Sequence, residues 1–242
     1  MVDVMAIARR IRSVTRPFGV ELRRFPGAHP LFPVGKLLDH AGVDQVVDVG
    51  ANVGQYAKGM RRVGYRGEIL SFEPLRDAYE QLCAAAKRDM RWRCECAAVG
   101  DHAGDGQIRR AGNSVSSSLA RMLPRHLASA PESAEVGVEQ VRIVTLDDIV
   151  DRYGLVPEKT FVKVDTQGFE RQVIAGGTRA MGHLAGVQLE LALVPLYEGD
   201  LSLMDGVSLM ADHGLDLVRM IPGFSDAETG EMLQADAVFL RR

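Results

Sequence analysis

The amino-acid sequence predicts an α/β fold: a doubly wound, mostly parallel seven-stranded sheet that ends in a C-terminal antiparallel hairpin. Short apolar runs alternate with helical patterns along the chain, which is typical of parallel sheets with crossover helices. The apolar run 46–49 leads directly into a glycine-rich turn, GANVG, that opens a helix. The last two apolar runs, 215–221 and 235–241, are joined by a segment too short and too poor in helical pattern for a crossover, so they should pair antiparallel.

The composition is that of a soluble globular protein. Of the 242 residues, 46% are hydrophobic and 25% are charged, and the formal net charge is -3. This balance gives no reason to expect nucleic acid as a partner, because a nucleic-acid-binding domain is usually strongly basic. No apolar run reaches the roughly 18 residues that a transmembrane helix needs. The three cysteines are too few for a disulfide framework, so we expect a cytoplasmic protein.

Residues 1–34 are predicted to form an N-terminal helix and a linker, ahead of a single domain at 35–242. In the segment 2–16, apolar residues share one helical face with arginines around it. One interpretation is an arm that touches an anionic lipid surface, which would make the protein peripheral to the inner membrane surface, or that covers the active site. The other is a helix packed on the core. The sequence also leaves open whether the protein forms a homodimer.

The glycine-rich turn after the first strand is the first candidate site. Parallel sheets bind nucleotides at such strand–turn–helix junctions, because loop N–H groups and the helix N-terminus converge there. Asp48 lies in the strand just before the turn, where an acid is unfavourable beside a phosphate but favourable beside a sulfonium or ammonium group. This favours S-adenosylmethionine over a dinucleotide as the cofactor. The cofactor-binding residues predicted here are Asp48, Gly50, Ala51, Asn52 and Gly54.

Two further segments should complete the cofactor site. The predicted second strand, 68–72, is followed by an acid about 20 to 25 residues beyond the glycine turn, placed to accept the ribose hydroxyl protons. The predicted third strand, 90–99, ends in small residues that can lie against an adenine ring, and Asp101 is near enough to reach its exocyclic amine. The residues predicted from these segments are Glu73, Pro74, Ala98, Val99 and Asp101.

Between residues 102 and 139 the hydrophobic pattern weakens. The segment is rich in Gly, Ser, Ala and Pro and contains the polar run NSVSSSL at 113–119. A segment of this length without strong periodicity is usually a functional lid or a disordered excursion. We expect a lid-like insertion at about 102–140 over the cofactor, ending in an edge strand at 141–144; a surface excursion is the alternative.

Polar residues cluster after the predicted strand 160–164, at the rim where ligands of parallel sheets lie. Asp165 is the first candidate for the general base, although it could instead hold the ammonium group of the cofactor. Glu190, an isolated acid in the apolar run 187–193, and Lys163 are the next candidates. Asp165 and Glu190 could hold a divalent metal ion, but no ligand spacing demands one, so no metal ligand is assigned.

Taken in order, these motifs resemble the FkbM-type family of S-adenosylmethionine-dependent methyltransferases. The resemblance covers about 46–240 and rests on VDVGANVG, SFEP, AAVGD, SVSSSL, TLDD, VKVDTQGFE with IAGG, QLEL and DAVFLR. It implies a Rossmann-like class I methyltransferase domain that binds its cofactor across the C-terminal strand ends. It also implies methyl transfer to a hydroxyl of a sugar, a glycolipid or a polyketide-type natural product. The family usually carries Glu where this chain has Gln167, whereas Asp165 and Glu170 are intact.

Two other function classes remain open at this point. A nicotinamide-dependent oxidoreductase would use a similar glycine turn and ribose acid; Asp48, the Asn52 that replaces the middle glycine, and the closing hairpin argue against it. A non-catalytic nucleotide-binding module would bind the cofactor and dock a partner through its serine-rich segment. The polar cluster of Lys163, Asp165 and Glu170 argues against that reading.

Overall fold

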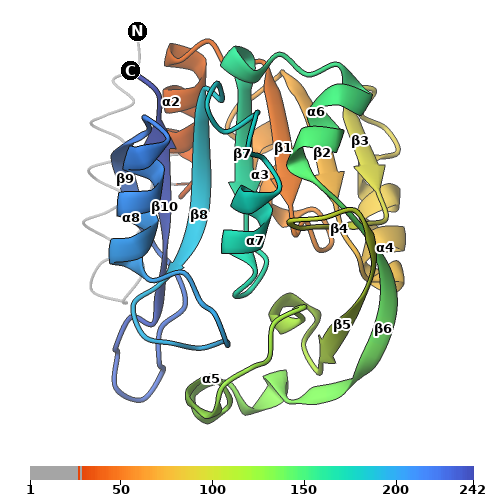
Figure 1. Cartoon of the computed structure of the whole chain (residues 1–242), viewed down its shortest axis with the longest axis vertical. Helices are drawn as coiled ribbons and strands as arrows, with labels where there is room; N and C mark the ends of the chain where they lie inside the picture. Colours follow the sequence, from red (N-terminus) through yellow and green to blue (C-terminus); the bar gives the residue numbers. More distant parts are fainter. Residues whose placement is uncertain (1–26, 28) are drawn as a thin grey trace, which may run out of the picture.

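The computed structural model describes Gly27 and residues 29–242. The predicted N-terminal helix at 2–16 lies outside these residues. The described part contains a seven-stranded sheet, in the order β3-β2-β1-β7-β8-β10-β9, and a three-stranded sheet, in the order β4-β6-β5 (Figure 1). The first seven elements are α2 (Phe32–His40), β1 (Gln45–Val49), α3 (Gln55–Arg62), β2 (Glu68–Phe72), α4 (Arg76–Ala86), β3 (Trp92–Glu95) and β4 (Ala98–Val99).

The remaining elements carry the chain through the small sheet and back to the large one. The insertion contains β5 (Gly104–Ala111), η2 (Ser114–Ser116), α5 (Pro124–Ser129), η3 (Pro131–Ser133) and β6 (Glu135–Val144). The rest comprises α6 (Leu146–Tyr153), η4 (Pro157–Lys159), β7 (Thr160–Val164), α7 (Glu170–Ala175), β8 (Gly186–Ala192), α8 (Leu203–Asp212), β9 (Asp216–Pro222) and β10 (Gln234–Leu240).

The large sheet has the predicted doubly wound, mostly parallel architecture. β1 pairs in parallel with both β2 and β7, β2 with β3, and β7 with β8. β10 runs antiparallel to both β8 and β9, which confirms the C-terminal hairpin. The chain moves outward from β1 to β3 and then resumes on the other side of β1 with β7. The carboxyl ends of β1 and β7 are therefore the switch point, where open α/β sheets bind ligands.

Helices cover both faces of the large sheet (Figure 1). Apolar residues of α6, α7 and α8 form one core cluster with Val47 and Val49 of β1, and those of α2, α3 and α4 form a second cluster with Val46. Successive strand residues point to opposite faces, so a strand covered on both sides is apolar at nearly every position. This explains why the short apolar runs in the sequence predict the central strands. No helix in the described part of the chain is long and apolar enough to cross a bilayer.

Two predictions about the region after β3 are wrong. The strand predicted at 90–99 is divided: β3 is an edge of the large sheet, whereas β4 belongs to the small sheet, where Ala98 and Val99 pair with β6. The strand predicted at 141–144 is not at an edge, because it is the end of the ten-residue β6, the middle strand of the small sheet. Most side chains of β5 and of the first half of β6 are exposed, which removes the apolar alternation that would have predicted them.

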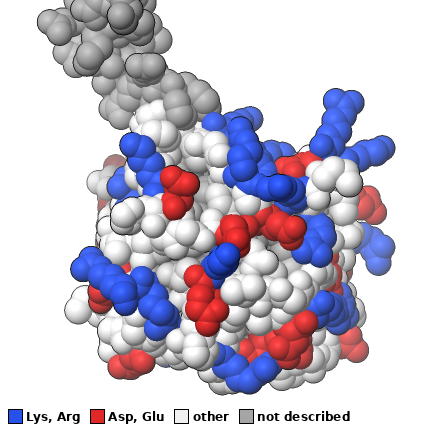
Figure 2. Space-filling view, turned by 90° about the horizontal axis from the view of Figure 1, so that it is seen from above, with Lys and Arg blue, Asp and Glu red and all other residues white. Residues whose placement is uncertain are grey.

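The amino ends of the strands form a face of mixed charge. Seen from above in Figure 2, Lys and Arg side chains lie beside Asp and Glu. The ion pairs of this end include Arg93–Glu68 at 3.0 Å and Lys159–Asp44 at 3.7 Å. All four side chains are half exposed, so each pair contributes little to stability. The insertion lies at the opposite end, beyond the carboxyl ends of β1 and β7 (Figure 1).

Candidate functional site

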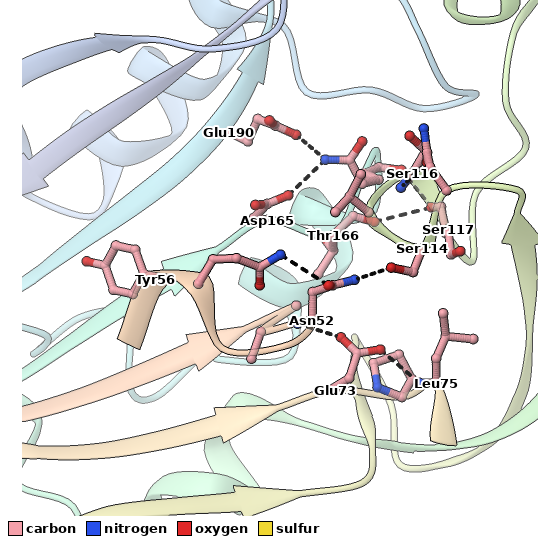
Figure 3. Close-up of a pocket in the computed structure, with 18 of the residues that line it drawn as sticks. Asn52, Tyr56, Glu73, Leu75, Ser114, Ser116, Ser117, Asp165, Thr166 and Glu190 are labelled. Atoms are coloured by element: carbon pink, nitrogen blue, oxygen red, sulfur yellow. Dashed lines mark hydrogen bonds between the residues drawn. The ribbon is translucent and has the colours of Figure 1, made fainter. Parts of the chain in front are cut away.

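A cavity of about 570 Å³ lies at the carboxyl ends of the central strands. One wall comes from the turn after β1 and the end of β2, and a second from the ends of β7, β8 and β10. The third comes from the serine run and α5 of the insertion (Figure 3). Its volume is in the range of small-molecule sites. The cavity therefore occupies the switch point at which the sequence predicts the cofactor.

The turn after β1 shapes the wall and offers few free donors. Gly50 has φ 72°, and a Cβ atom there would lie 1.9 Å from the carbonyl oxygen of Asp165, so only glycine fits. The N–H groups of Gly50 and Ala51 bond to the carbonyl of Phe72, at 3.1 and 3.0 Å. The Asn52 N–H donates to the Glu73 carboxylate. Contrary to the sequence-based expectation, these three N–H groups are used within the protein.

The Glu73 carboxylate is held at the cavity wall by two backbone donors. Its oxygens accept the N–H of Asn52 at 2.8 Å and the N–H of Leu75 at 2.9 Å (Figure 3). Burial raises the pKa of Glu73 to about 7, although both N–H donors act in the opposite direction. The side chain is only 4% exposed, and it lines the cavity. The neighbouring wall is apolar and consists of Pro74, Leu75, Ala97, Ala98, Val99 and Ile108.

Asp48 and Lys163 form a buried pair that the register of β1 and β7 places side by side. Asp48 is fully buried and does not line the cavity, whereas Lys163 does. Lys163 Nζ lies 3.4 Å from Asp48 Oδ1 and 3.2 Å from Asp165 Oδ2, and it donates to the carbonyl of Gly50 at 3.2 Å. Burial lowers the pKa of Lys163, but the Asp165 and Asp48 carboxylates outweigh it and raise this pKa above its ordinary value. Among the described residues, the ammonium group of Lys163 is therefore the cation that pairs with Asp48.

Asp165 and Glu190 meet across the amide of Gln167. Gln167 Nε2 donates to Asp165 Oδ1 at 2.8 Å and to Glu190 Oε2 at 2.5 Å (Figure 3). Gln234 Nε2 donates to the same Glu190 oxygen at 3.0 Å, and the Tyr197 hydroxyl donates to Gln167 Oε1 at 3.1 Å. Burial raises the pKa of Glu190 well above its usual range, and the nearby Asp165 carboxylate adds to the effect. The three predicted catalytic candidates thus share one wall.

The serine run lies over the cavity and is tied to two of its walls. The Asn52 side-chain amide donates to Ser114 Oγ at 3.1 Å, on the side of the glycine turn. Ser118 Oγ donates to the carbonyl oxygen of Gln167 at 2.6 Å, on the side of β7. All residues of the run from 113 to 118 line the cavity. The segment that lacks periodicity in the sequence is therefore ordered by contacts with both walls.

An aromatic cluster closes the side of the cavity away from Glu73. His126 of α5 stacks on Phe224 with ring centroids 5.5 Å apart, and it meets the Tyr197 ring edge-on at 5.1 Å. The buried Nδ1 atom of His126 has no hydrogen-bond partner among the described residues. Burial lowers the pKa of His126 below its usual value. Arg125, the next residue of α5, pairs with Glu231 in the loop between β9 and β10 at 2.6 Å.

The structure places ten of the predicted site residues in the cavity wall and three outside it. Those in the wall are Gly50, Ala51, Asn52, Glu73, Pro74, Ala98, Val99, Lys163, Asp165 and Glu190. Outside are Asp48, Gly54 and Asp101, whose direct contact with a ligand stays a prediction. Gly54 packs closely against Trp92, and the Asp101 carboxylate lies 2.7 Å from His102 Nδ1.

Several wall residues carry no motif from which sequence reasoning could have found them. They are Tyr56, Gln188, Phe224, Gln234 and Asp236, and Tyr197 stands behind them. Each is a single polar or aromatic residue in a strand, helix or loop. Gln188 and Asp236 fall within the quoted motifs QLEL and DAVFLR, but neither motif indicates that they line a site. Among the described residues, no group of three His, Cys, Asp or Glu side chains is arranged to hold a metal ion.

Comparison with known proteins places the chain in a family. Residues 48–226, more than half of the chain, match the model of the methyltransferase FkbM domain. The solved structure of methyltransferase FkbM from Methylobacillus flagellatus is similar over 82% of this chain and 44% of that protein, with 16% identity and a TM-score of 0.50. The present chain thus spans less than half of that protein, and the likeness concerns the fold. No curated protein matches the chain.

Two further solved structures are more distant. A putative RNA methyltransferase from Pyrococcus horikoshii has 13% identity and a TM-score of 0.46, over 91% of this chain and 88% of that one. The 1,6-didemethyltoxoflavin-N1-methyltransferase from Burkholderia thailandensis was solved with S-adenosylhomocysteine. It has 10% identity and a TM-score of 0.44, over 100% of this chain and 91% of that one. The family match over most of the domain and the observed sheet agree. The chain belongs to the FkbM family of S-adenosylmethionine-dependent methyltransferases.

Proposed function

We propose that the chain binds S-adenosylmethionine in this cavity and transfers its methyl group to a hydroxyl of a sugar, a glycolipid or a polyketide-type natural product. The observation that carries the proposal is Glu73: a carboxylate fixed in the cavity wall at the end of the second strand, beside an apolar wall. Such an acid can accept hydrogen bonds from both ribose hydroxyls while the adenine ring packs on the apolar residues. When bound, S-adenosylmethionine supplies a methyl group on a positively charged sulfur.

The charges of the cavity fit a cationic ligand. Among the described residues, its wall carries the acids Glu73, Glu132, Asp165, Glu190 and Asp236, against one lysine, Lys163. Acids that face a common hollow raise the local concentration of cations. We assign the ribose to Glu73, the adenine ring to the wall that includes Ala98 and Val99, and the methionine part to the turn from Asp48 to Gly54. For Asp48 and Gly54, contact would be indirect, through the residues in front of them.

We infer that Asp165 is the general base. A hydroxyl acceptor has to lose its proton during methyl transfer, and a carboxylate in the cavity wall is placed to receive it. Lys163 is held as a cation by its two carboxylates, so it orients Asp165 and balances its charge, and does not itself accept a proton. Glu190 lies on the same wall, and its Oε2 accepts the side-chain amide N–H groups of Gln167 and Gln234. Alignment of the acceptor oxygen behind the methyl group supplies most of the remaining acceleration.

The side of the cavity away from Glu73 supports a ring-shaped acceptor that bears hydroxyls. The stacked rings of His126 and Phe224 offer an apolar surface, and Gln188, Gln234 and Asp236 offer amide and carboxylate partners. Sugar rings are bound by this combination of an aromatic face with planar polar side chains. We propose that the insertion at 102–140 acts as a lid over both the cofactor side and the acceptor side of the cavity, since its serine run and α5 form one wall.

Ligand binding and transfer are tested in two steps. S-adenosylhomocysteine should raise the unfolding temperature in a thermal-shift assay and NAD should not; the reverse would identify an oxidoreductase. Transfer of labelled methyl from S-adenosylmethionine is then measured on alkyl glycosides, glycolipids and macrolactones. Binding without transfer to any of these hydroxyl acceptors would contradict the proposed O-methylation and favour a non-catalytic module.

A further inference from the structure

The amide of Gln167 stands between two carboxylates in a position that a metal ion could take. Its nitrogen lies 2.8 Å from Asp165 Oδ1 and 2.5 Å from Glu190 Oε2. A Ca²⁺ ion lies about 2.3–2.6 Å from its carboxylate ligands, so the distance to Glu190 is in this range and the distance to Asp165 is slightly longer. The amide has two N–H groups, one for each carboxylate, so it can bridge them as a cation does, though without a formal charge.

The orientation of this amide is set by its surroundings. The one hydrogen of the Tyr197 hydroxyl has two acceptors in reach, Gln167 Oε1 at 3.1 Å and the carbonyl oxygen of Ser116 at 3.0 Å. The contact with Gln167 Oε1 keeps the NH₂ group turned toward the carboxylates. Ser118 Oγ holds the Gln167 carbonyl at 2.6 Å. The backbone of Gln167 has φ 57°, a left-handed conformation that a residue other than glycine keeps only where its surroundings determine it. The insertion and the core thus jointly fix the amide.

We propose that Gln167 is a positioning residue whose amide takes the place of a divalent cation between Asp165 and Glu190. The pair is then held ready for the acceptor without a metal ion. This inference rests on the proposed function insofar as it assigns the two carboxylates to the acceptor. Its structural content, the amide in the place of a cation, stands on the two distances alone.

The proposal makes a specific prediction for a carboxylate at this position. Gln167→Glu keeps the length and shape of the side chain but replaces the donor by a third carboxylate in contact with the other two. Three carboxylates this close repel one another even with Lys163 beside Asp165, so the group should take up either a proton or a further cation. The variant should therefore bind a divalent cation at this position more tightly than the natural chain does.

The experiment is a calorimetric titration of MnCl₂ into the full chain, with the Mn²⁺ paramagnetic resonance signal as a second readout. Gln167→Glu should bind one Mn²⁺ at least about tenfold more tightly than the natural chain, because oxygen ligands suit this ion. The gain should disappear when Asp165→Asn is added. Gln234→Glu is the matched control, since Gln234 donates to Glu190 but not to Asp165, and it should show no comparable gain.

Two results would overturn the proposal. One is a Gln167→Glu chain with an unchanged circular-dichroism spectrum that binds Mn²⁺ no more tightly than the natural chain. The other is a natural chain that already binds one Mn²⁺ in a manner that Asp165→Asn abolishes. If Gln167→Glu does not fold, Gln167→Ala replaces it, because it opens the space between the same carboxylates, and no gain there has the same meaning. The titration contains neither S-adenosylmethionine nor an acceptor, so its failure is distinguishable from failure of the proposed transfer.

Discussion

The affinity for S-adenosylhomocysteine should depend on pH through Glu73. Burial raises the pKa of this carboxyl to about 7 in the free protein, and the ribose hydroxyls can donate only to its ionised form. If the protonated form does not bind, affinity rises with pH and levels off above the pKa. For a pKa of about 7, the fraction ionised falls about 25-fold between pH 7.5 and pH 5.5, so the dissociation constant should rise by the same factor.

The measurement is isothermal titration calorimetry between pH 5.5 and 8, on the natural chain and on Glu73→Gln. The variant keeps the shape of the side chain but loses the charge, so at pH 8 it should bind about 10- to 100-fold more weakly, as expected for charge-assisted hydrogen bonds of about 1.5–3 kcal/mol. The affinity of Glu73→Gln for S-adenosylhomocysteine should also no longer change with pH. Glu170→Gln is the control, because the pKa of Glu170 is also raised to about 7 but its side chain does not line the cavity. A flat profile for the natural chain, or the same slope in Glu73→Gln, would refute the role of Glu73.

Three further predictions concern catalysis and stability. Asp165→Asn should lower turnover about 100-fold or more on an acceptor found in the panel, while the chain still folds; full activity would remove Asp165 from the mechanism. Gly50→Ala should cost more than about 2 kcal/mol in a urea titration, because the new Cβ meets the Asp165 carbonyl; an unchanged midpoint would contradict this. Burial raises the pKa of Glu170 to about 7 from 4.5, so the folded state keeps a proton that the unfolded state releases. Glu170 alone should lower the stability by about 3 kcal/mol as pH rises from 4.5 to 7, in addition to the fall that Glu73 causes. Glu170→Gln should remove the Glu170 share of this slope and leave the share of Glu73.

The central strands could be predicted because their residues are buried on both faces. β1, β2, β7 and β8 are covered by helices on each side, so each strand is a short, mainly apolar run in the sequence. The small sheet could not be predicted in this way. β5 buries only Ile108 and Ala111, and it is held by pairing with β6, a contact between residues about 30 positions apart. Such strands depend on a partner that local patterns do not identify.

The site was predictable as far as the carboxyl ends of parallel strands meet at one edge. Glu73 and Asp165 directly follow their strands and Glu190 lies near the end of a third, and that rule alone brings them into one cavity. The rule says nothing about which side chains pair across neighbouring strands. The register sets Asp48 opposite Lys163, so the acid that the sequence suggested for a ligand cation already has a cation of the chain beside it. The argument for a positively charged ligand therefore moves from Asp48 to the acids of the cavity wall.

Gln167 is a second residue whose role depends on contacts that the sequence does not predict. From the sequence, an amide in place of an acid reads as the loss of a charge next to Asp165. In the structure the amide supplies two hydrogen-bond donors that an ionised acid would lack. Asp165 and Glu190 both accept from it, and Tyr197 contacts its oxygen. Glu190 lies 23 residues further along the chain and Tyr197 lies 30 residues further, so no local motif joins them to Gln167. Whether one substituted residue weakens a site or replaces an ion in it depends on partners that only the fold brings together.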